Sequence, residues 1–376
     1  MPQPTPSTQT LRIYSSFPTK GASSYESRLM VQAIDLAIRE RGGGVSGRSV
    51  EHIALDGGSG ENGEWSPLVE SANAERAAND PQALVYIGPY TSGATGVALP
   101  ITNRAHLLTL GPTATWPGLT LDGWEEGESG KYFPTGERNF ARLALPDSRQ
   151  GEVAARWASS SGMKRTFVLN DGSSYSIGLA RHFTIEAKKG GLGIAGEAAF
   201  TPSDQAALVG KLREGVADAI FFAPSSTGSA INFARLLDGA QLSLTAFLSD
   251  TAMSDQFLEA VGDNASRWRI LYNGGEANTD RAGWKAFASR FQGAYSIPPS
   301  QAAARAYDLA NRALEAIKID PGIDRAELTR RVLATRGYEG ASGVISFDEN
   351  GDSVSSRLVG YRIEGGRFVK DKVIEQ

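Results

Sequence analysis

The sequence contains no cysteine and only three histidines, His52, His106 and His182. The absence of cysteine excludes thiol catalysis, zinc–thiolate sites and disulfide bonds, although it does not fix the compartment. The histidines are isolated along the chain, and none has the spacing of metal ligands. We therefore expect no metal site and no resident cofactor.

Long apolar runs and blocks of basic charge are absent as well. No stretch approaches the roughly 18 apolar residues of a membrane-spanning helix. The net charge is −4 and has no basic block, so nucleic acid and anionic membranes are not expected partners. A content of 41% hydrophobic and 21% charged residues is ordinary for a globular protein. The 376 residues are too many for one typical core, and we expect two domains.

Residues 1–10, MPQPTPSTQT, are rich in Pro, Thr, Ser and Gln, which predicts a flexible tether. They lack the charged start and apolar centre of a signal peptide. A Met directly before such a tether indicates that an export segment has been removed. A cytosolic protein with an irregular N-terminus would look the same, so both readings stay open.

The stretch from Leu84 to Thr115 predicts a strand, a helix and a second strand, which implies parallel pairing. Ser92 is expected to cap the helix, and Pro100 to weaken it. Hydroxyl residues follow both strands, at Ser92, Thr113 and Thr115. With the amide groups of a helix N-terminus they could hold one carboxylate, because ligands bind outside the carboxyl ends of such strands. Capping and turn formation remain the alternative.

Similar alternation fills most of the chain and predicts α/β domains with parallel sheets. Strands are expected at residues 11–16, 49–55, 84–87, 107–110, 140–145, 166–169, 194–200, 219–222, 244–248 and 269–273. The chain should end in hairpins at 343–347, 358–363 and 368–373. An aromatic stripe over 284–295 predicts core packing, and the Gly-rich segment 56–64 predicts a solvated turn. The insertion 116–137 could cover a cleft or decorate the surface.

Four short motifs lie in loops at strand ends, and their order and spacing are characteristic when taken together. These motifs are IGPYTSGAT, GPTATWP, NDGSSYSIG and FLSD. From about residue 11 to 374 the chain resembles the leucine/isoleucine/valine-type periplasmic solute-binding proteins of ABC transporters. The resemblance implies the type I periplasmic binding protein fold, with two doubly wound lobes joined by three crossovers and closing as a clamshell. It implies lobe 1 at residues 11–143 plus 274–341 and lobe 2 at 144–273 plus 342–376.

The resemblance also implies a ligand site. Ser92 matches the family's carboxylate-binding serine, and Thr113, Ala114 and Thr115 lie on the loop that holds the carboxylate and the amino group. Tyr175 and Asp250 match the second-lobe residues that close on the ligand and pair with its ammonium group. The remaining expected ligand-binding residues are Phe17, Tyr25, Tyr90, Thr91 and Ser225. Asp250 as a helix N-cap, and Tyr175 as a packing residue of its own lobe, are the alternatives.

The implied function is capture of an amino acid and its delivery to the permease and ATPase of an ABC importer. An apolar ligand side chain is expected because the residues expected to form the pocket wall, Phe17, Tyr25, Tyr90 and the run Ala302–Ala304, are uncharged. The small run Ala302–Ala304 leaves room for an aromatic or other small carboxylate, which is one alternative. A ligand-sensing receptor domain is another. Enzyme activity is not expected, because no nucleophile–base pair, phosphate loop or metal set is visible. We expect a monomer in the periplasm or outside the cell; lipid anchoring of the precursor stays open.

Overall fold

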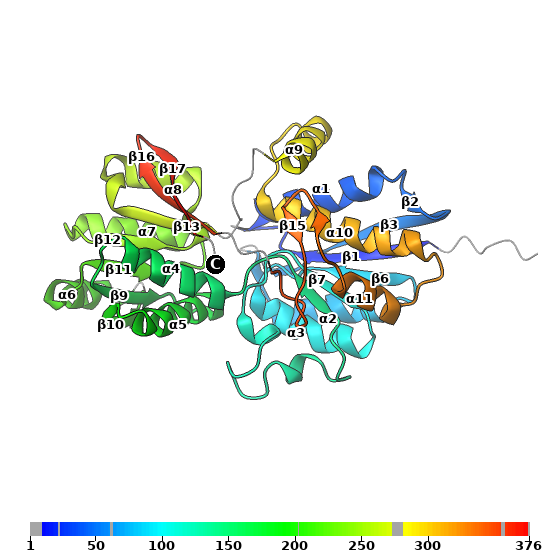
Figure 1. The fold of residues 1–376 in the computed structure, drawn as a ribbon, viewed down its shortest axis with the longest axis horizontal. Coiled ribbons are helices and arrows are strands. Elements are labelled where there is room, and N and C mark those ends of the chain that lie inside the picture. The colour runs from blue at the N-terminus through cyan, green and yellow to red at the C-terminus, as the bar shows by residue number, and fades with distance from the viewer. Residues whose placement is uncertain are drawn as a thin grey trace, which may run out of the picture. The chain divides into compact units, whose positions relative to one another are not determined.

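Figure 1 shows the fold as a computed structural model, which describes residues 10–21, 23–60, 63–201, 203–272, 281–354 and 358–374. Contacts divide the chain into two compact units. Unit 1 comprises Met1–Ala114, Gly118–Ala144 and Ala277–Ser355, and unit 2 comprises Thr115–Pro117, Leu145–Glu276 and Ser356–Gln376. The tether predicted at residues 1–10 lies outside the described residues except for Thr10.

The sheet of unit 1 has six strands in the order β2-β3-β1-β6-β7-β8. All neighbours pair in parallel except β2 and β3, which pair antiparallel. The strands are β1 (Leu11–Phe17), β2 (Gly44–Val45), β3 (Arg48–Asp56), β6 (Ala83–Ile87), β7 (Leu108–Gly111) and β8 (Phe140–Arg142). The central strand β1 lies between β3 and β6, which explains why its residues are buried on both faces.

The two faces of this sheet are covered by different helices. Ile13 and Phe17 belong to a core shared with α1 (Ser24–Arg39) and α10 (Gln301–Ile319), whereas Tyr14 packs with α2 (Pro67–Ala78) and α3 (Ser92–Arg104). Alternation of side chains along β1 makes this possible. The core of α1 and α10 also takes in α9 (Ala282–Tyr295) and α11 (Arg325–Leu333). Phe287 and Phe291 of α9 are fully buried, so the core packing predicted for that stripe is confirmed.

The sheet of unit 2 has seven strands in the order β10-β9-β11-β12-β13-β16-β17. The first five pair in parallel, and β16 and β17 add an antiparallel hairpin. The strands are β9 (Arg165–Asn170), β10 (Gly193–Ala199), β11 (Ala219–Phe222), β12 (Thr245–Leu248), β13 (Trp268–Tyr272), β16 (Leu358–Glu364) and β17 (Arg367–Ile374). The terminal hairpin was predicted from its alternating residues and glycine turn.

Unit 2 is also covered by helices on both faces. One core joins Val168 and Phe221 to α4 (Asp147–Ser160) and α5 (Ser174–Lys189). The other joins Phe222 to α6 (Gln205–Glu214), α7 (Thr227–Gly239) and α8 (Asp255–Val261). Two short 3-10 helices, η3 (Asp250–Ala252) and η4 (Gly262–Arg267), follow β12 and α8. Both units are therefore doubly wound, as expected.

Residues 342–354 belong to unit 1, which corrects the expectation that lobe 2 begins again at residue 342. A short hairpin of β14 (Tyr338–Glu339) and β15 (Val344–Ile345) ties this segment to residues before the expected boundary. Asp308 of α10 accepts hydrogen bonds from the backbone N–H groups of Ala341 and Ser342, at 2.8 and 2.7 Å. These contacts attach the segment after residue 341 to unit 1. A boundary taken from a family resemblance does not take such contacts into account.

The last part of the insertion at 116–137, from Tyr132 onward, packs on α3. The insertion contains the 3-10 helices η1 (Pro117–Leu119) and η2 (Gly130–Tyr132). Asn103 of α3 donates to the carbonyl of Glu137 at 2.7 Å and accepts from the N–H of Thr135 at 3.0 Å. A Cβ atom at Gly96 would lie 3.2 Å from the ring of Tyr132, so the absence of a side chain there lets the ring lie against the helix.

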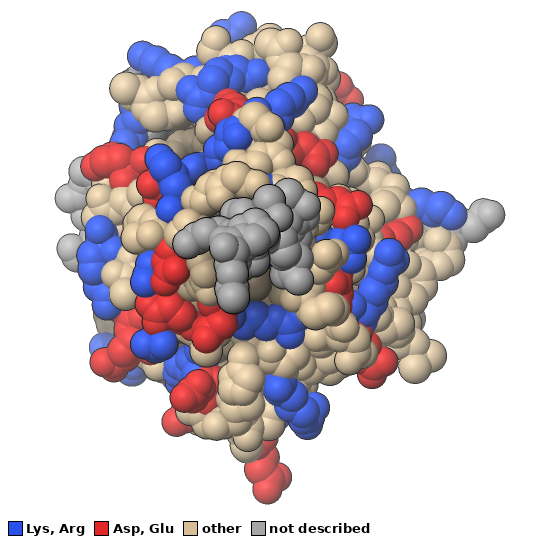
Figure 2. All heavy atoms as spheres, turned by 90° about the vertical axis from the view of Figure 1, so that its right-hand side faces the viewer, with Lys and Arg blue, Asp and Glu red and all other residues tan. Residues whose placement is uncertain are grey.

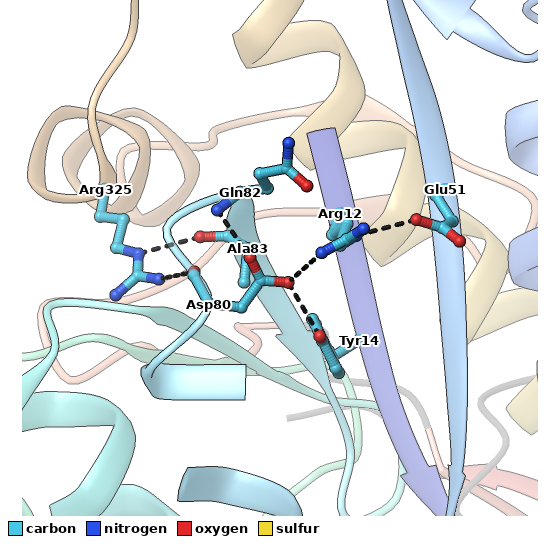
Figure 3. A network of polar contacts seen from close by, with 7 residues as sticks. All are labelled: Arg12, Tyr14, Glu51, Asp80, Gln82, Ala83 and Arg325. Carbon is cyan, nitrogen blue, oxygen red and sulfur yellow. Dashed lines mark hydrogen bonds and ion pairs between the residues drawn. The ribbon is translucent and has the colours of Figure 1, made fainter. Parts of the chain in front are cut away.

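Charged side chains hold the amino-terminal edge of the unit 1 sheet together (Figure 3). Arg12 binds Glu51 at 2.8 Å and Asp80 at 3.0 Å, and the Tyr14 hydroxyl donates to Asp80 at 2.8 Å. Burial alone would raise the pKa of Asp80, but its hydrogen bonds outweigh burial and lower that pKa. Arg325 of α11 donates to the carbonyl groups of residues 80 and 83. This edge is thus held by a network of charges.

Figure 2 shows the face of the protein on the right-hand side of Figure 1. Lys and Arg side chains lie among Asp and Glu side chains there. Nucleic-acid-binding faces instead gather positive charge. No described helix is long and apolar enough to cross a membrane.

Candidate functional site

The carboxyl-terminal edge of the unit 1 sheet brings together the loops after β6 and β7. Gly88, directly after β6, has a φ of 114°, and a Cβ atom there would lie 2.9 Å from the carbonyl oxygen of Ser16. Its N–H donates to the carbonyl of Leu110 in β7 at 2.8 Å. A glycine is required at this position because both the backbone conformation and the space exclude a side chain. The loop that follows β6 is therefore fixed against β1 and β7.

Thr91, not Ser92, is the N-cap of α3, which corrects the sequence expectation. The backbone of Thr91 is extended, and its Oγ1 accepts a hydrogen bond from the N–H of Ala94 at 3.2 Å. The Thr91 carbonyl also accepts from the N–H and the hydroxyl of Thr95, both at 2.9 Å. Ser92 is the first residue of the helix and is partly exposed. In this position its hydroxyl lies at the positive end of the helix dipole.

Thr113 ties the loop after β7 to the loop after β6, because its hydroxyl donates to the carbonyl of Tyr90 at 2.6 Å. The carbonyls on either side of Thr113 receive guanidinium groups: Arg305 of α10 donates to Pro112, and Arg142 donates to Ala114, both at 3.4 Å. Ala114 is fully buried, whereas Thr113 is partly exposed. The structure thus brings Tyr90 and Thr113 together and leaves Thr113 accessible.

Thr115 groups with unit 2 rather than with Thr113. Its carbonyl accepts a hydrogen bond from the N–H of Asp147, the first residue of α4, at 2.9 Å. Next to it, the ring of Trp116 packs on α5, where a Cβ atom at Gly178 would lie 2.6 Å from the indole. Residues Thr115–Pro117 are therefore grouped with unit 2, and the chain returns to unit 1 at Gly118.

The three aromatic residues expected in the pocket wall, Phe17, Tyr25 and Tyr90, have different surroundings. Phe17 is 1% exposed and belongs to the core of unit 1, with its ring against Gly88. Tyr25, on the first turn of α1, is 51% exposed and lies against the guanidinium of Arg28, 5.2 Å from the ring centre. Tyr90 is partly buried against the same core as Phe17. Only Tyr25 and Tyr90 therefore offer side-chain surface to solvent.

Trp65 was not predicted from the sequence, although it lies beside the candidate site. It ends a small hairpin of β4 (Gly58–Ser59) and β5 (Glu64–Trp65). Its six-membered ring lies against Gly93, the second residue of α3. The sequence signal was a tryptophan just after a Gly-rich segment that follows a strand. That segment was predicted to be a solvated turn, and residues 61–62 of it lie outside the described residues.

In unit 2 the structure brings Tyr175 and Asp250 together. The Tyr175 hydroxyl donates to Oδ1 of Asp250 at 3.1 Å, and both residues are partly exposed. Burial of the hydroxyl, followed by the negative charges of Asp250 and Asp147, raises the pKa of Tyr175 well above its usual value. Asp250 opens the short helix η3, and Ser249 occupies the N-cap position before it. Asp250 is therefore not a helix N-cap, which was the alternative interpretation of this residue.

Ser225 serves a second carboxylate that sequence reasoning missed. Asp171, which follows β9, accepts from the N–H and the hydroxyl of Ser225, each at 2.7 Å, and from the hydroxyl of Ser229 at 3.2 Å. Its other oxygen accepts from Ser173, the N-cap of α5. Asp171 thus holds the loops after β9 and β11 together. The acid in NDGSS was its only sequence signal.

One described cluster has the connectivity of a serine-hydrolase triad. The hydroxyl of Ser15 lies 2.9 Å from Nε2 of His52, and Nδ1 of His52 lies 2.7 Å from Asp35. Ser15 sits in the middle of β1 with an exposed fraction of 0%, so a substrate has no path to its oxygen. The cluster gives hydrogen-bond partners to the buried Ser15 hydroxyl and to the ring of His52. No group of three or more His, Asp or Glu residues in the described ranges is placed to hold a metal ion.

Comparisons with known proteins agree on the family. A sequence model of the family described as "Periplasmic binding protein" matches residues 11–367. The Leu/Ile/Val-binding protein BraC3 of Rhizobium johnstonii is 28% identical over 345 residues, covering 88% of this chain and 85% of that protein.

Two solved structures share the fold. The leucine-binding protein LivK of Thermotoga maritima has a TM-score of 0.81 and 23% identity, covering 97% of this chain and 99% of that one. A solute-binding protein of an ABC transporter from Rhodopseudomonas palustris BisB5, in complex with 3,4-dihydroxybenzoic acid, has a TM-score of 0.79 and 19% identity. The alignment covers 98% of both chains.

Proposed function

The chain belongs to the periplasmic binding protein family, and from this premise we propose that it captures an amino acid and delivers it to an ABC importer. The observation that carries the proposal is the Tyr175–Asp250 pair. It places a partly exposed carboxylate, already oriented by a hydroxyl, beyond the end of β12. A ligand ammonium group is the partner that such a carboxylate favours.

The donors of unit 1 supply the complementary half of the site in this proposal. Ser92 lies in the first turn of α3, and the hydroxyl of Thr113, on the adjacent loop, would exchange the carbonyl of Tyr90 for the ligand carboxylate as its acceptor. Helix N-termini and hydroxyl groups stabilise a carboxylate without a cation. A zwitterion held by Asp250 at one end and by Ser92 and Thr113 at the other would favour closure of the two units. Thr115 would then contact the ligand at the point where the chain passes from unit 1 to unit 2.

A small aromatic carboxylate is the second candidate ligand. It would use the donors of unit 1 in the same way and would not need Asp250. The R. palustris protein, which was solved with 3,4-dihydroxybenzoic acid, supports this candidate through its fold alone. The leucine-type relative BraC3 supports the amino acid instead. We give the amino acid precedence because its ammonium group would pair with Asp250, whereas benzoate has no cationic group.

A thermal-shift panel on the purified protein tests the proposal. Leucine, phenylalanine, lysine, glutamate and benzoate are each added in excess. A ligand at 100 times its Kd stabilises by about 2.7 kcal/mol, which raises the unfolding midpoint visibly. We expect leucine or phenylalanine to raise it most. No response to any of the five compounds would contradict the proposal.

The same proposal places the protein outside the cytoplasm as a monomer that works with a membrane permease and an ATPase. It also makes the protein a carrier and not an enzyme. Native mass spectrometry of the purified protein should therefore release the ligand unchanged, at one ligand per monomer. A released molecule that differs from the one supplied would indicate catalysis.

A further inference from the structure

The hairpin β4–β5, which carries Trp65, is seated firmly at the carboxyl-terminal edge of unit 1. Oδ1 of Asp56, the last residue of β3, accepts from the N–H of Thr19 at 3.0 Å and from the N–H of Gly58 at 2.9 Å. The Thr19 hydroxyl donates to the other carboxylate oxygen. Asp56 therefore fixes the start of the hairpin and the loop after β1 to each other.

Two further contacts hold the same hairpin. Asn73 of α2 donates to the carbonyl of Asp56 at 2.8 Å. Directly before the other strand, a Cβ atom at Gly63 would lie 2.0 Å from the carbonyl oxygen of Lys20, so the backbones there are in direct contact. With both strands attached, the position of Trp65 is set by the loops that surround the candidate site.

The indole of Trp65 lies against the first turn of α3. A Cβ atom at Gly93 would lie 2.5 Å from Cζ2 and 3.0 Å from Cη2 of the ring. Gly93 directly follows Ser92, so the ring is one residue from the proposed carboxylate-binding serine. Trp65 is nevertheless 37% exposed, which leaves much of its surface uncovered.

We propose that Trp65 is a specificity-determining residue, and that the ligand carries a planar aromatic group that packs on its indole. This inference rests on the proposed function and narrows its ligand class. A ligand whose carboxylate is bound at Ser92 has the rest of its body within reach of the ring beside Gly93. An aromatic ring can lie parallel or edge-on to an indole and gains from the ring quadrupoles as well as from burial. A branched aliphatic side chain gains from burial only.

Calorimetric titration with L-phenylalanine, L-leucine and benzoate tests the inference on four proteins. These are the wild type, Trp65→Phe, Trp65→Ala and the matched control Leu68→Ala. Leu68 lies three residues further on, at the start of α2, and is 84% exposed. Trp65→Ala should weaken phenylalanine and benzoate about tenfold, the size of a lost aromatic pair, and leucine at most about threefold. Trp65→Phe and Leu68→Ala should stay close to the wild type.

Tryptophan fluorescence supplies a second readout that does not depend on the folding of Trp65→Ala. Titration of the wild type with phenylalanine should change the emission, and most of this change should be missing in Trp65→Phe although its affinity is kept. A Trp65→Ala variant that weakens all three ligands equally, or none of them, would overturn the inference while leaving the proposed function in place. A wild type that binds none of the three would overturn both.

Discussion

Both units contain a tyrosine hydroxyl that donates a hydrogen bond to a carboxyl group, in very different surroundings. In unit 1, Tyr86 of β6 donates to Glu70 of α2 at 2.5 Å, and the exposed fraction of both residues is 0%. In unit 2, Tyr175 donates to Asp250 at 3.1 Å, and both residues are partly exposed. The first pair lies between a helix and a sheet, and the second lies where a strand has ended.

Burial decides what each pair can do. The hydroxyl of Ser16 donates to the second oxygen of Glu70 at 2.7 Å, so both carboxyl oxygens are bonded inside the protein. Burial raises the pKa of Glu70 to about 7, although the hydrogen bonds from Tyr86 and Ser16 lower it. The pair in unit 1 therefore holds α2 on the sheet. The same chemistry suits a ligand only at a strand end that solvent reaches.

The largest effect is expected from Asp250→Asn, which removes the charge of the exposed pair and keeps its shape. The ligand ammonium group would lose its charged partner, at a cost of roughly 2–5 kcal/mol of binding free energy. Calorimetric titration with L-leucine measures the loss. Binding of benzoate, which has no ammonium group, should be unchanged.

Asp255→Asn is the matched control for this variant, since Asp255 is exposed on α8 five residues away. It should bind leucine like the wild type. If Asp250→Asn also kept the wild-type affinity for leucine, Asp250 would not be part of the site, and the contrast between the two tyrosine pairs would lose its functional meaning.

A smaller effect, on stability, is expected from the buried pair. The pKa of Glu70 rises from 4.5 to about 7 on folding. Its contribution to stability is therefore fully present below pH 4.5 and is lost as the pH rises through about 7, by at most about 3 kcal/mol. Glu70→Gln has no such loss. Urea titrations at about pH 4.5, 6 and 8 should show that the free energy of unfolding of the variant increases relative to that of the wild type as the pH rises.

His182 of α5 provides a control of opposite sign. Burial lowers its pKa from 6.5 to about 3, so its contribution is present above pH 6.5 and is lost as the pH falls through about 3. The free energy of unfolding of His182→Asn should therefore increase relative to that of the wild type as the pH falls. The same trend with pH in both variants would contradict the assignment of Glu70 as a buried acid.

The smallest effect is expected from Thr113→Val, which removes the hydroxyl that binds the carbonyl of Tyr90. A neutral hydrogen bond contributes about 1 kcal/mol, so affinity should fall about fivefold. Leucine and benzoate should lose equally, because both present a carboxylate to unit 1. Thr113→Ser keeps the hydroxyl and should restore binding. A loss confined to leucine would show that Thr113 acts on the ammonium end instead.

Much of the fold could be predicted because strands and helices have periods that a single sequence displays. The alternation of apolar strands with helices gave the doubly wound architecture, and the resemblance of four loops gave the family. The N-cap of α3 was placed one residue late because Thr91 and Ser92 are both good caps. Only the backbone angles, which neighbouring loops impose, distinguish them.

The site was predicted less completely, since its parts meet through contacts between distant segments. Asp171 joins loops that are 54 residues apart, and nothing near it in sequence indicates that role. Trp65 reaches Gly93 from a hairpin that the Gly-rich sequence does not announce. The roles assigned to Ser92, Thr115 and Asp250 remain predictions until binding is measured.

The late position of α10 in the sequence has a consequence for folding during translation. This helix supplies fully buried residues to the core of unit 1, among them Leu309 and Leu314, but it is synthesised after residues 145–272 of unit 2. Until then the apolar face of β1 formed by Ile13 and Phe17 lacks its second helix. Incomplete cores of this kind invite association with other chains. We therefore expect the core of unit 1 to stay incomplete, and the growing chain to need protection, until its last quarter emerges. Unit 2 is completed later still, because its strands β16 and β17 follow α10 in the sequence.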